Sequence, residues 1–170
     1  MTRRLAAIRS HVALIALLAA ATTVPAATNL KGSEAPDFVL KSLSGQNLRL
    51  SEYRGEIVML SFWAAWCGDC RAQLEQLGAM RERYQDAGLT LLAVSLDQNQ
   101  KQAEDAAERL GGSFPVLHDA AGDVGRLYDV SRMPVMVLID RSGIVRDVFE
   151  GFRRGAEEQY LERVQALLRE

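Results

Sequence analysis

Two cysteines, Cys67 and Cys70, are separated by two residues and follow a nearly unbroken apolar run over residues 57–62, with residues 63–66 between. A run of this kind is typical of a strand that is buried on both faces of a sheet. Apolar residues then recur at helical spacing, at Leu74, Leu77 and Met80. The pattern predicts a buried strand that leads through the cysteine pair into a helix over about 67–85, ended by Gly88.

The rest of the chain alternates between extended and helical patterns. The expected extended segments are 36–40 and 48–50, which form a hairpin around Gly45, and then 89–96, 114–117, 135–139 and 144–149. The expected helices are 100–110, 123–128 and 156–168. A β-α-β crossover followed by a β-β-α finish predicts an α/β domain with a mixed central sheet.

The position of the cysteine pair at the start of a helix has a chemical consequence. Unpaired amides and the positive end of the helix dipole stabilise a thiolate at Cys67 and lower its pKa. A thiolate attacks a disulfide to form a mixed disulfide, which a second thiol resolves. We therefore expect Cys67, the more exposed position, to be the nucleophile and Cys70 to be the resolving thiol.

Three other interpretations of the pair stay open. A structural disulfide would close a loop too short to constrain the unfolded chain much. A zinc site needs two more ligands, and beyond the N-terminal segment the only histidine is His118. A copper site could use His118 as a third ligand. His118 is otherwise expected at a strand end, and Asp97 and Asp119 at turns.

The N-terminal segment differs from the rest of the chain. Arg3, Arg4 and Arg9 precede an uncharged run over 12–28 that ends in small residues. This pattern predicts that residues 1–26 are a secretory signal peptide or, alternatively, a membrane anchor, although the run is marginally short for a span of about 20 residues. Residues 27–170 are then one extracytoplasmic domain, in the periplasm or its equivalent.

Residues 62–71, Phe-Trp-Ala-Ala-Trp-Cys-Gly-Asp-Cys-Arg, resemble the thioredoxin active-site motif. The surrounding segments 32–50, 114–119 and 130–143 resemble the TlpA/ResA-like branch of exported thiol-disulfide oxidoreductases. The resemblance covers about residues 32–168. It implies a thioredoxin-like three-layer α/β/α sandwich with a mixed central sheet and an N-terminal β-hairpin extension.

The resemblance also implies roles for residues around the cysteines. Pro134 matches the cis-proline that faces the sulfurs in this fold, and the backbone of Met133 would then pair with a bound peptide. Gly68, Asp69 and the tryptophan pair would support the site, with Trp66 sheltering it; Trp63 is equally compatible with an ordinary core position. No metal or other cofactor is implied.

Two departures from the family pattern bear on the chemistry. Asp69 stands where the family usually has proline, and its carboxylate either opposes thiolate formation or caps the helix start. Ser61 stands where thioredoxins carry a buried acid that assists the resolving thiol. The first departure predicts a more reducing pair. The second leaves open which group replaces the acid.

The predicted function is the reduction of protein disulfides outside the cytoplasm, with electrons from a membrane-bound or thioredoxin-type donor. Related proteins act in cytochrome c maturation or reduce copper-site cysteines, and the sequence does not choose between these. The alternatives are an oxidase or isomerase of folding proteins, a thiol peroxidase, and a copper-binding module. Basic residues are scattered, which argues against a nucleic-acid partner.

Overall fold

A five-stranded mixed sheet forms the centre of the computed structural model, which describes residues 30–170. Its strands are β3 (Ile57–Trp63), β4 (Leu89–Ser95), β5 (Val116–His118), β6 (Val135–Ile139) and β7 (Val145–Glu150). They lie in the order β5-β4-β3-β6-β7. β3 pairs with β4 and β4 with β5 in parallel, whereas β3 pairs with β6 and β6 with β7 in antiparallel. The mixed sheet expected from the β-α-β and β-β-α pattern is confirmed.

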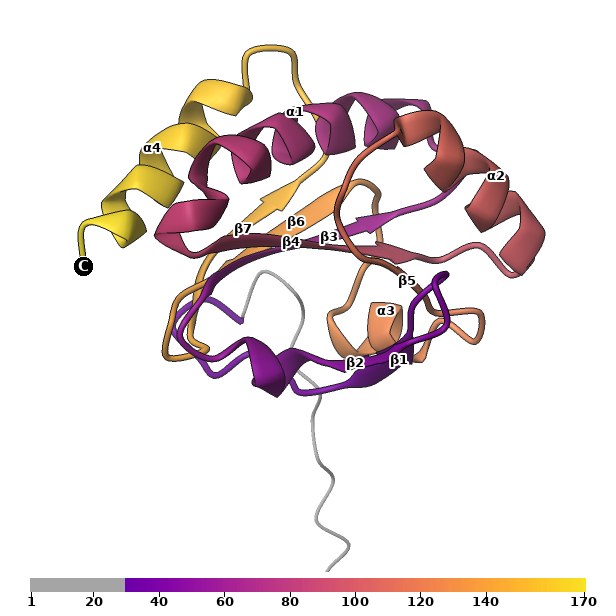
Figure 1. Cartoon of the computed structure of the whole chain (residues 1–170), viewed down its shortest axis with the longest axis horizontal. Helices are drawn as coiled ribbons and strands as arrows, with labels where there is room; N and C mark the ends of the chain where they lie inside the picture. Colours follow the sequence, from indigo (N-terminus) through magenta and orange to yellow (C-terminus); the bar gives the residue numbers. More distant parts are fainter. Residues whose placement is uncertain (1–29) are drawn as a thin grey trace, which may run out of the picture.

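Two layers cover the sheet, as Figure 1 shows. One layer consists of the helices α1 (Gly68–Tyr84), α2 (Gln100–Leu110) and α4 (Glu157–Leu168). The other combines the N-terminal hairpin, β1 (Val39–Lys41) and β2 (Asn47–Arg49), with the short helix α3 (Asp123–Leu127). Short 3-10 turns follow β2 and α1, at Leu50–Tyr53 and Gln85–Ala87. The thioredoxin-like sandwich with its hairpin extension is therefore confirmed.

The central strand β3 explains why the chain folds around the segment before the cysteines. All seven of its residues are buried. Val58, Leu60 and Phe62 pack on the side of the hairpin and α3. Ile57 and Met59 pack against α1 and α4 on the other side. A strand apolar on both faces fits only the middle of a covered sheet, so the cysteines that follow it are held at the sheet's carboxyl edge.

The helix boundaries follow from local chemistry. The Asn99 side chain caps α2 by accepting hydrogen bonds from the amides of Lys101 and Gln102. Gly111 ends α2 at a φ of 61°, in the left-handed region that favours glycine. The Asp119 carboxylate accepts from the amides of Asp123 and Gly125 and so fixes the start of α3.

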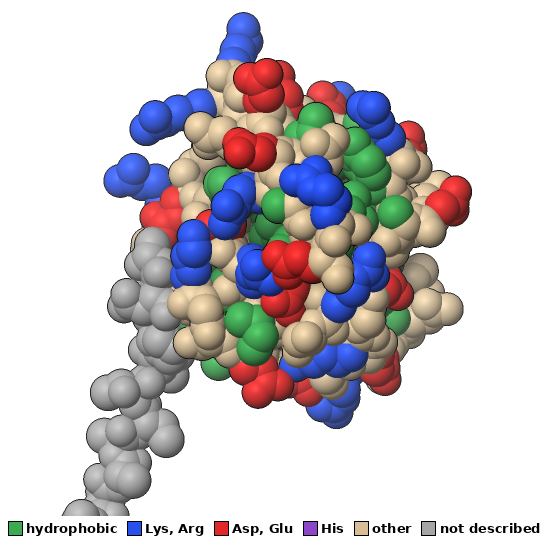
Figure 2. Space-filling model, turned by 90° about the vertical axis from the view of Figure 1, so that its left-hand side faces the viewer, with side chains coloured by type: hydrophobic (Ala, Val, Ile, Leu, Met, Phe, Trp, Pro, Cys, Tyr) green, Lys and Arg blue, Asp and Glu red, His purple; other side chains and the backbone are tan. Residues whose placement is uncertain are grey.

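The surface on the side of the α4 C-terminus carries charges of both signs. Figure 2 shows Lys and Arg side chains interspersed with Asp and Glu over this face. Neither sign forms a continuous field there. Within residues 30–170, no helix has the length and apolar character that crossing a membrane requires. The segment expected to be a signal peptide or anchor, residues 1–26, lies outside the described residues.

Candidate active site

Cys67 and Cys70 form a disulfide at the start of α1. Cys67 is the N-cap residue of this helix, and its sulfur accepts a hydrogen bond from the Cys70 amide at 3.2 Å. Cys67 is half-buried, whereas Cys70 is fully buried. An amide donor aimed at the Cys67 sulfur stabilises negative charge there after reduction, because the hydrogen bond favours the ionised form.

The two tryptophans before the cysteines have opposite environments. Trp66 is 73% exposed, although it is one of the largest apolar side chains of the protein. Trp63 is buried in a small cluster with Cys70, Leu74 and Ala106. Trp63 is therefore a core residue beneath the site. Trp66 is on the surface beside Cys67, where an exposed aromatic side chain can contact a docked protein.

A buried carboxylate holds the loop between β3 and Cys67. Both oxygens of Asp97 accept from the Ala65 amide, at 3.1 and 2.9 Å, and one also accepts from the Ser95 hydroxyl at 2.9 Å. The ring nitrogen Nε2 of His118 lies 2.8 Å from the Asp97 carbonyl oxygen. Asp97, which was expected at a turn, lies in the loop after β4, where it is 2% exposed and anchors the active-site loop.

This placement also accounts for His118, the expected strand-end residue. His118 is indeed the last residue of β5 and is engaged with the Asp97 backbone. Within residues 30–170, no group of three or more His, Cys, Asp or Glu side chains is arranged to hold a metal ion.

A chain of neutral polar groups lies under α1, on the sheet face that also carries Trp63. The Ser61 hydroxyl donates to the Gln73 side-chain oxygen at 3.2 Å, and the Gln73 amide donates to the Tyr160 hydroxyl at 3.1 Å. All three residues are 0–1% exposed. Burial raises the pKa of Tyr160, and the hydrogen bond from Gln73 lowers it in part. We call these three residues, Ser61, Gln73 and Tyr160, the Gln73 chain. All of them therefore stay uncharged near neutral pH.

The Gln73 chain shows which polar groups are buried around Ser61, where thioredoxins carry a buried acid. Gln73 follows Cys70 by one helical turn, so both side chains project from the same side of α1. The buried polar side chain nearest in sequence to the resolving cysteine is thus an amide. An amide orients and hydrogen-bonds, but it does not take up a proton at neutral pH.

The segment before β6 completes the site. The Met133–Pro134 peptide bond is cis, as the resemblance implied. Met133 packs against the same cluster as Cys67 and Cys70. The Gly151 amide, in the loop after β7, donates to the Pro134 carbonyl at 2.8 Å. Three loops, after β3, before β6 and after β7, therefore meet at one end of the molecule. Gly68 and Asp69 are exposed in the first turn of α1.

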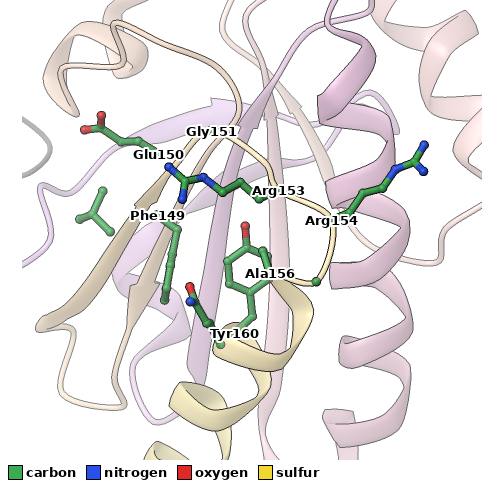
Figure 3. Close-up of a pocket in the computed structure, with 10 residues that line it drawn as sticks. Phe149, Glu150, Gly151, Arg153, Arg154, Ala156 and Tyr160 are labelled. Atoms are coloured by element: carbon green, nitrogen blue, oxygen red, sulfur yellow. The ribbon is translucent and has the colours of Figure 1, made fainter.

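Two of the hollows near this end of the molecule bear on the site. One of about 380 Å³ lies between β7, the following loop and the start of α4, where Figure 3 shows the rings of Phe149 and Tyr160 packed together beneath Arg153. The other is a smaller pocket of about 150 Å³ directly beside Cys67. It is bounded by the active-site loop, the start of α1 and the last turn of α2.

Comparison with known proteins agrees with this arrangement. The sequence pattern of the AhpC/TSA family matches residues 31–148. The thiol-disulfide oxidoreductase ResA of Geobacillus thermodenitrificans is 38% identical over 120 residues, which cover 71% of this chain and 69% of that protein. The chain belongs to the ResA-like thiol-disulfide oxidoreductases of the AhpC/TSA family.

Solved structures place this ResA-like chain in the same fold. A Chlorobium tepidum structure assigned as the thiol:disulfide interchange protein DsbE has a TM-score of 0.78 and 37% identity, covering 81% of this chain and 97% of its own. The exposed lipoprotein thioredoxin Etrx1 of Streptococcus pneumoniae has a TM-score of 0.64 and 28% identity, covering 78% and 100%. The TlpA/ResA-like resemblance is confirmed, and the activity is thiol-disulfide exchange at a C-x-x-C pair.

Sequence reasoning found the cysteines and the cis-proline but missed two positions. Asp97 and Gln73 were not singled out as site residues. Asp97 could have been found, because it follows β4 at the carboxyl edge next to the end of β3, where parallel strands bring their loops together. Gln73 carried no such signal, because it is one of several polar residues of the helix α1.

Proposed function

We propose that the chain reduces protein disulfides outside the cytoplasm, with Cys67 as the attacking sulfur and Cys70 as the resolving one. The assignment of roles rests on the different burial of the two cysteines: Cys67 is half-buried, whereas the Cys70 side chain is fully buried. The Cys67 sulfur also accepts a hydrogen bond from the Cys70 amide. A substrate disulfide can reach only the first sulfur of such a pair.

The reaction proceeds in two exchanges. The Cys67 thiolate attacks one sulfur of the substrate disulfide, which breaks that S–S bond and releases the other sulfur as a thiolate. The Cys70 thiolate then attacks the Cys67 sulfur and releases the second substrate thiolate. Two electrons pass to the substrate, whose thiolates take up protons, and the Cys67–Cys70 disulfide remains. A dithiol donor, membrane-bound or of thioredoxin type, reduces it by the same chemistry.

The surrounding groups support this cycle in different ways. The Asp97 carboxylate fixes the loop that leads to Cys67, and Trp66 offers an exposed apolar contact to the substrate protein. Met133, packed against the cysteine cluster, offers its backbone to an extended substrate segment. The Asp69 carboxylate lies in the first turn of α1 and disfavours a thiolate at Cys67, which favours the reducing direction.

The extracytoplasmic location rests on the N-terminal pattern. A basic start, an apolar run and small residues precede the domain. The structural relative from Streptococcus pneumoniae is an exposed lipoprotein. We propose export of residues 27–170, either released from a signal or held by a membrane tether.

Single cysteine variants test the assignment of roles. The reduced chain is mixed with a peptide disulfide, and the products are separated by mass. Wild type should reduce the peptide and end as the Cys67–Cys70 disulfide. Cys70→Ser should accumulate a mixed disulfide with the peptide, and Cys67→Ser should be inactive. Trapping by Cys67→Ser instead would contradict the assignment.

The peroxidase alternative is tested in the same reduced protein. Stopped-flow fluorescence follows its oxidation by hydrogen peroxide and by the peptide disulfide at equal concentrations. A disulfide reductase should react faster with the peptide. Preferential oxidation by peroxide would replace our proposal with a thiol peroxidase.

A further inference from the structure

The small pocket beside Cys67 has a lining of one electrostatic sign. Its apolar walls come from Trp63 at the end of β3, from Ala64 and Ala65 of the loop, and from two residues of α2, Ala106 and Leu110. The remaining lining residues are Cys67, Gly68, Arg71 and Arg109. No acidic residue lines this pocket, so its charged groups are two guanidinium groups, one from each helix.

The two arginines differ in how far they are already neutralised. Arg71 donates from Nε to Glu75 at 2.9 Å, in an exposed pair of the kind that contributes little energy. Arg109 makes no ion pair and no side-chain hydrogen bond with any residue in 30–170. The nearest acid one turn before it on α2, Asp105, is bound to Lys101. A cation without an ion pair among residues 30–170 therefore lines the same pocket as Cys67.

The pocket size limits what can enter it. Ligand pockets for small molecules typically span about 300–1,000 Å³. A volume of about 150 Å³ lies below this range. One side chain of a docked protein fits these dimensions.

We propose that this pocket, the Arg109 pocket, receives an acidic side chain next to the reactive cysteine of the substrate. The inference rests on the proposed reductase function and narrows its substrate class to disulfides flanked by Asp or Glu. A carboxylate entering the pocket meets guanidinium groups whose planar forks match its geometry. The same contact places the substrate sulfur near Cys67, because Cys67 forms part of the pocket wall.

Paired peptides test this preference in the full chain. Two disulfide peptides differ only in Glu or Gln beside each cysteine, and stopped-flow fluorescence gives the second-order rate constant for their reduction. The Glu peptide should react about fivefold faster at low salt, the upper range for a partly exposed ion pair. The preference should fade in 1 M salt, where the Debye length falls to about 3 Å.

Charge removal at two positions assigns the effect to the pocket. Arg109→Gln should bring the Glu and Gln peptides to equal rates, so the ratio of their two rate constants is the readout. Arg83→Gln removes the same charge from the far end of α1, about 18 Å along the helix from Arg71, and should leave the fivefold preference intact. Arg109→Lys should keep part of the preference, since it keeps the charge but loses the fork.

The outcomes separate this inference from the function on which it rests. Equal rates for both peptides in wild type, or a preference that survives in Arg109→Gln, would overturn the pocket assignment while the reductase function stands. Dependence on Arg109 for oxidised glutathione but not for the peptides would also overturn it, since the carboxylate would then belong to a small thiol. Failure to reduce either peptide would overturn both.

Discussion

The two sides of the central strand β3 differ in chemistry. Toward the hairpin and α3, Val58, Leu60 and Phe62 pack in an apolar cluster, whose largest side chain, Tyr128, donates its hydroxyl to the Pro36 carbonyl at 2.7 Å. Toward α1, the same strand presents Ser61, the first group of the buried Gln73 chain. One strand therefore presents only apolar side chains on one side, and on the other it combines Ile57 and Met59 with the polar Ser61 beneath the helix that carries the cysteines.

The difference has a physical basis. Apolar side chains stabilise the fold by burial, which does not depend on the direction of individual contacts. Such positions therefore tolerate a side chain of different shape better than one of different volume. A buried polar chain must instead satisfy every donor and acceptor, and the loss of one member leaves the others unpaired. Substitutions on the hairpin side should act on stability alone, whereas those on the α1 side should also act on thiol chemistry.

The largest effect on stability is expected from Leu60→Ala on the hairpin side. Removing a fully buried leucine side chain leaves a cavity and should lower the free energy of unfolding by about 2–5 kcal/mol. The matched variant Leu60→Met should cost less than about 1.5 kcal/mol. Chemical denaturation measures both. The rate of peptide disulfide reduction should stay at the wild-type value while Leu60→Ala is folded, and a comparable loss of rate would break the comparison.

An intermediate effect is expected from Gln73→Glu on the α1 side. Burial should raise the pKa of the new carboxyl above its usual value of about 4.3. The pKa of this carboxyl is therefore higher in the folded state than in the unfolded state. The stability of the variant relative to wild type is then greatest below the unfolded-state pKa, and it falls as pH rises through the folded-state pKa. The loss by pH 8 should be about 1.4 kcal/mol for each unit of the shift.

Denaturation of Gln73→Glu at pH 4 and pH 8 checks this sign, with Gln73→Met as the uncharged control. The control should show the same deficit at both pH values. The Glu variant should also resolve a mixed disulfide faster above its carboxyl pKa, since it offers the Cys70 thiol a base. A pH-independent deficit for Gln73→Glu would show that position 73 is not isolated from solvent.

The smallest effect is expected at the exposed rim of the site, from Asp69→Asn. Removing a carboxylate from the first turn of α1 favours the Cys67 thiolate and so stabilises the reduced form. An exposed charge interaction of up to about 1 kcal/mol corresponds to a rise in reduction potential of up to about 20 mV. Asp86→Asn, after the far end of α1, should leave the potential unchanged. A fall in potential on Asp69→Asn would contradict the charge effect assigned to Asp69.

Much of the fold could be predicted from local patterns. The apolar runs of β3 and β6 and the helix 100–110 were predicted at or within one residue of their observed bounds. These elements have a strong local signal, because apolar runs, an Asn cap and a glycine stop act over a few residues. The cysteine pair and Pro134 were found for a similar reason, since they stand in compact motifs.

The supporting groups of the site could not be predicted in this way. Gln73 is buried because Tyr160, 87 positions further along the chain, packs beneath it and accepts its hydrogen bond. Asp97 is buried because it reaches the amide of Ala65, 32 positions earlier. Such roles depend on which segments the fold brings together, and a single sequence gives no local signal for them.

The reduction potential of the Cys67–Cys70 pair tests the central claim most directly. The chain is equilibrated in glutathione buffers of known ratio, and tryptophan fluorescence reports the fraction oxidised. Our account predicts a value at or below about −200 mV, as expected of a reductase that depends on a dedicated electron donor. A value near about −120 mV, the range of a strong oxidant, would contradict it.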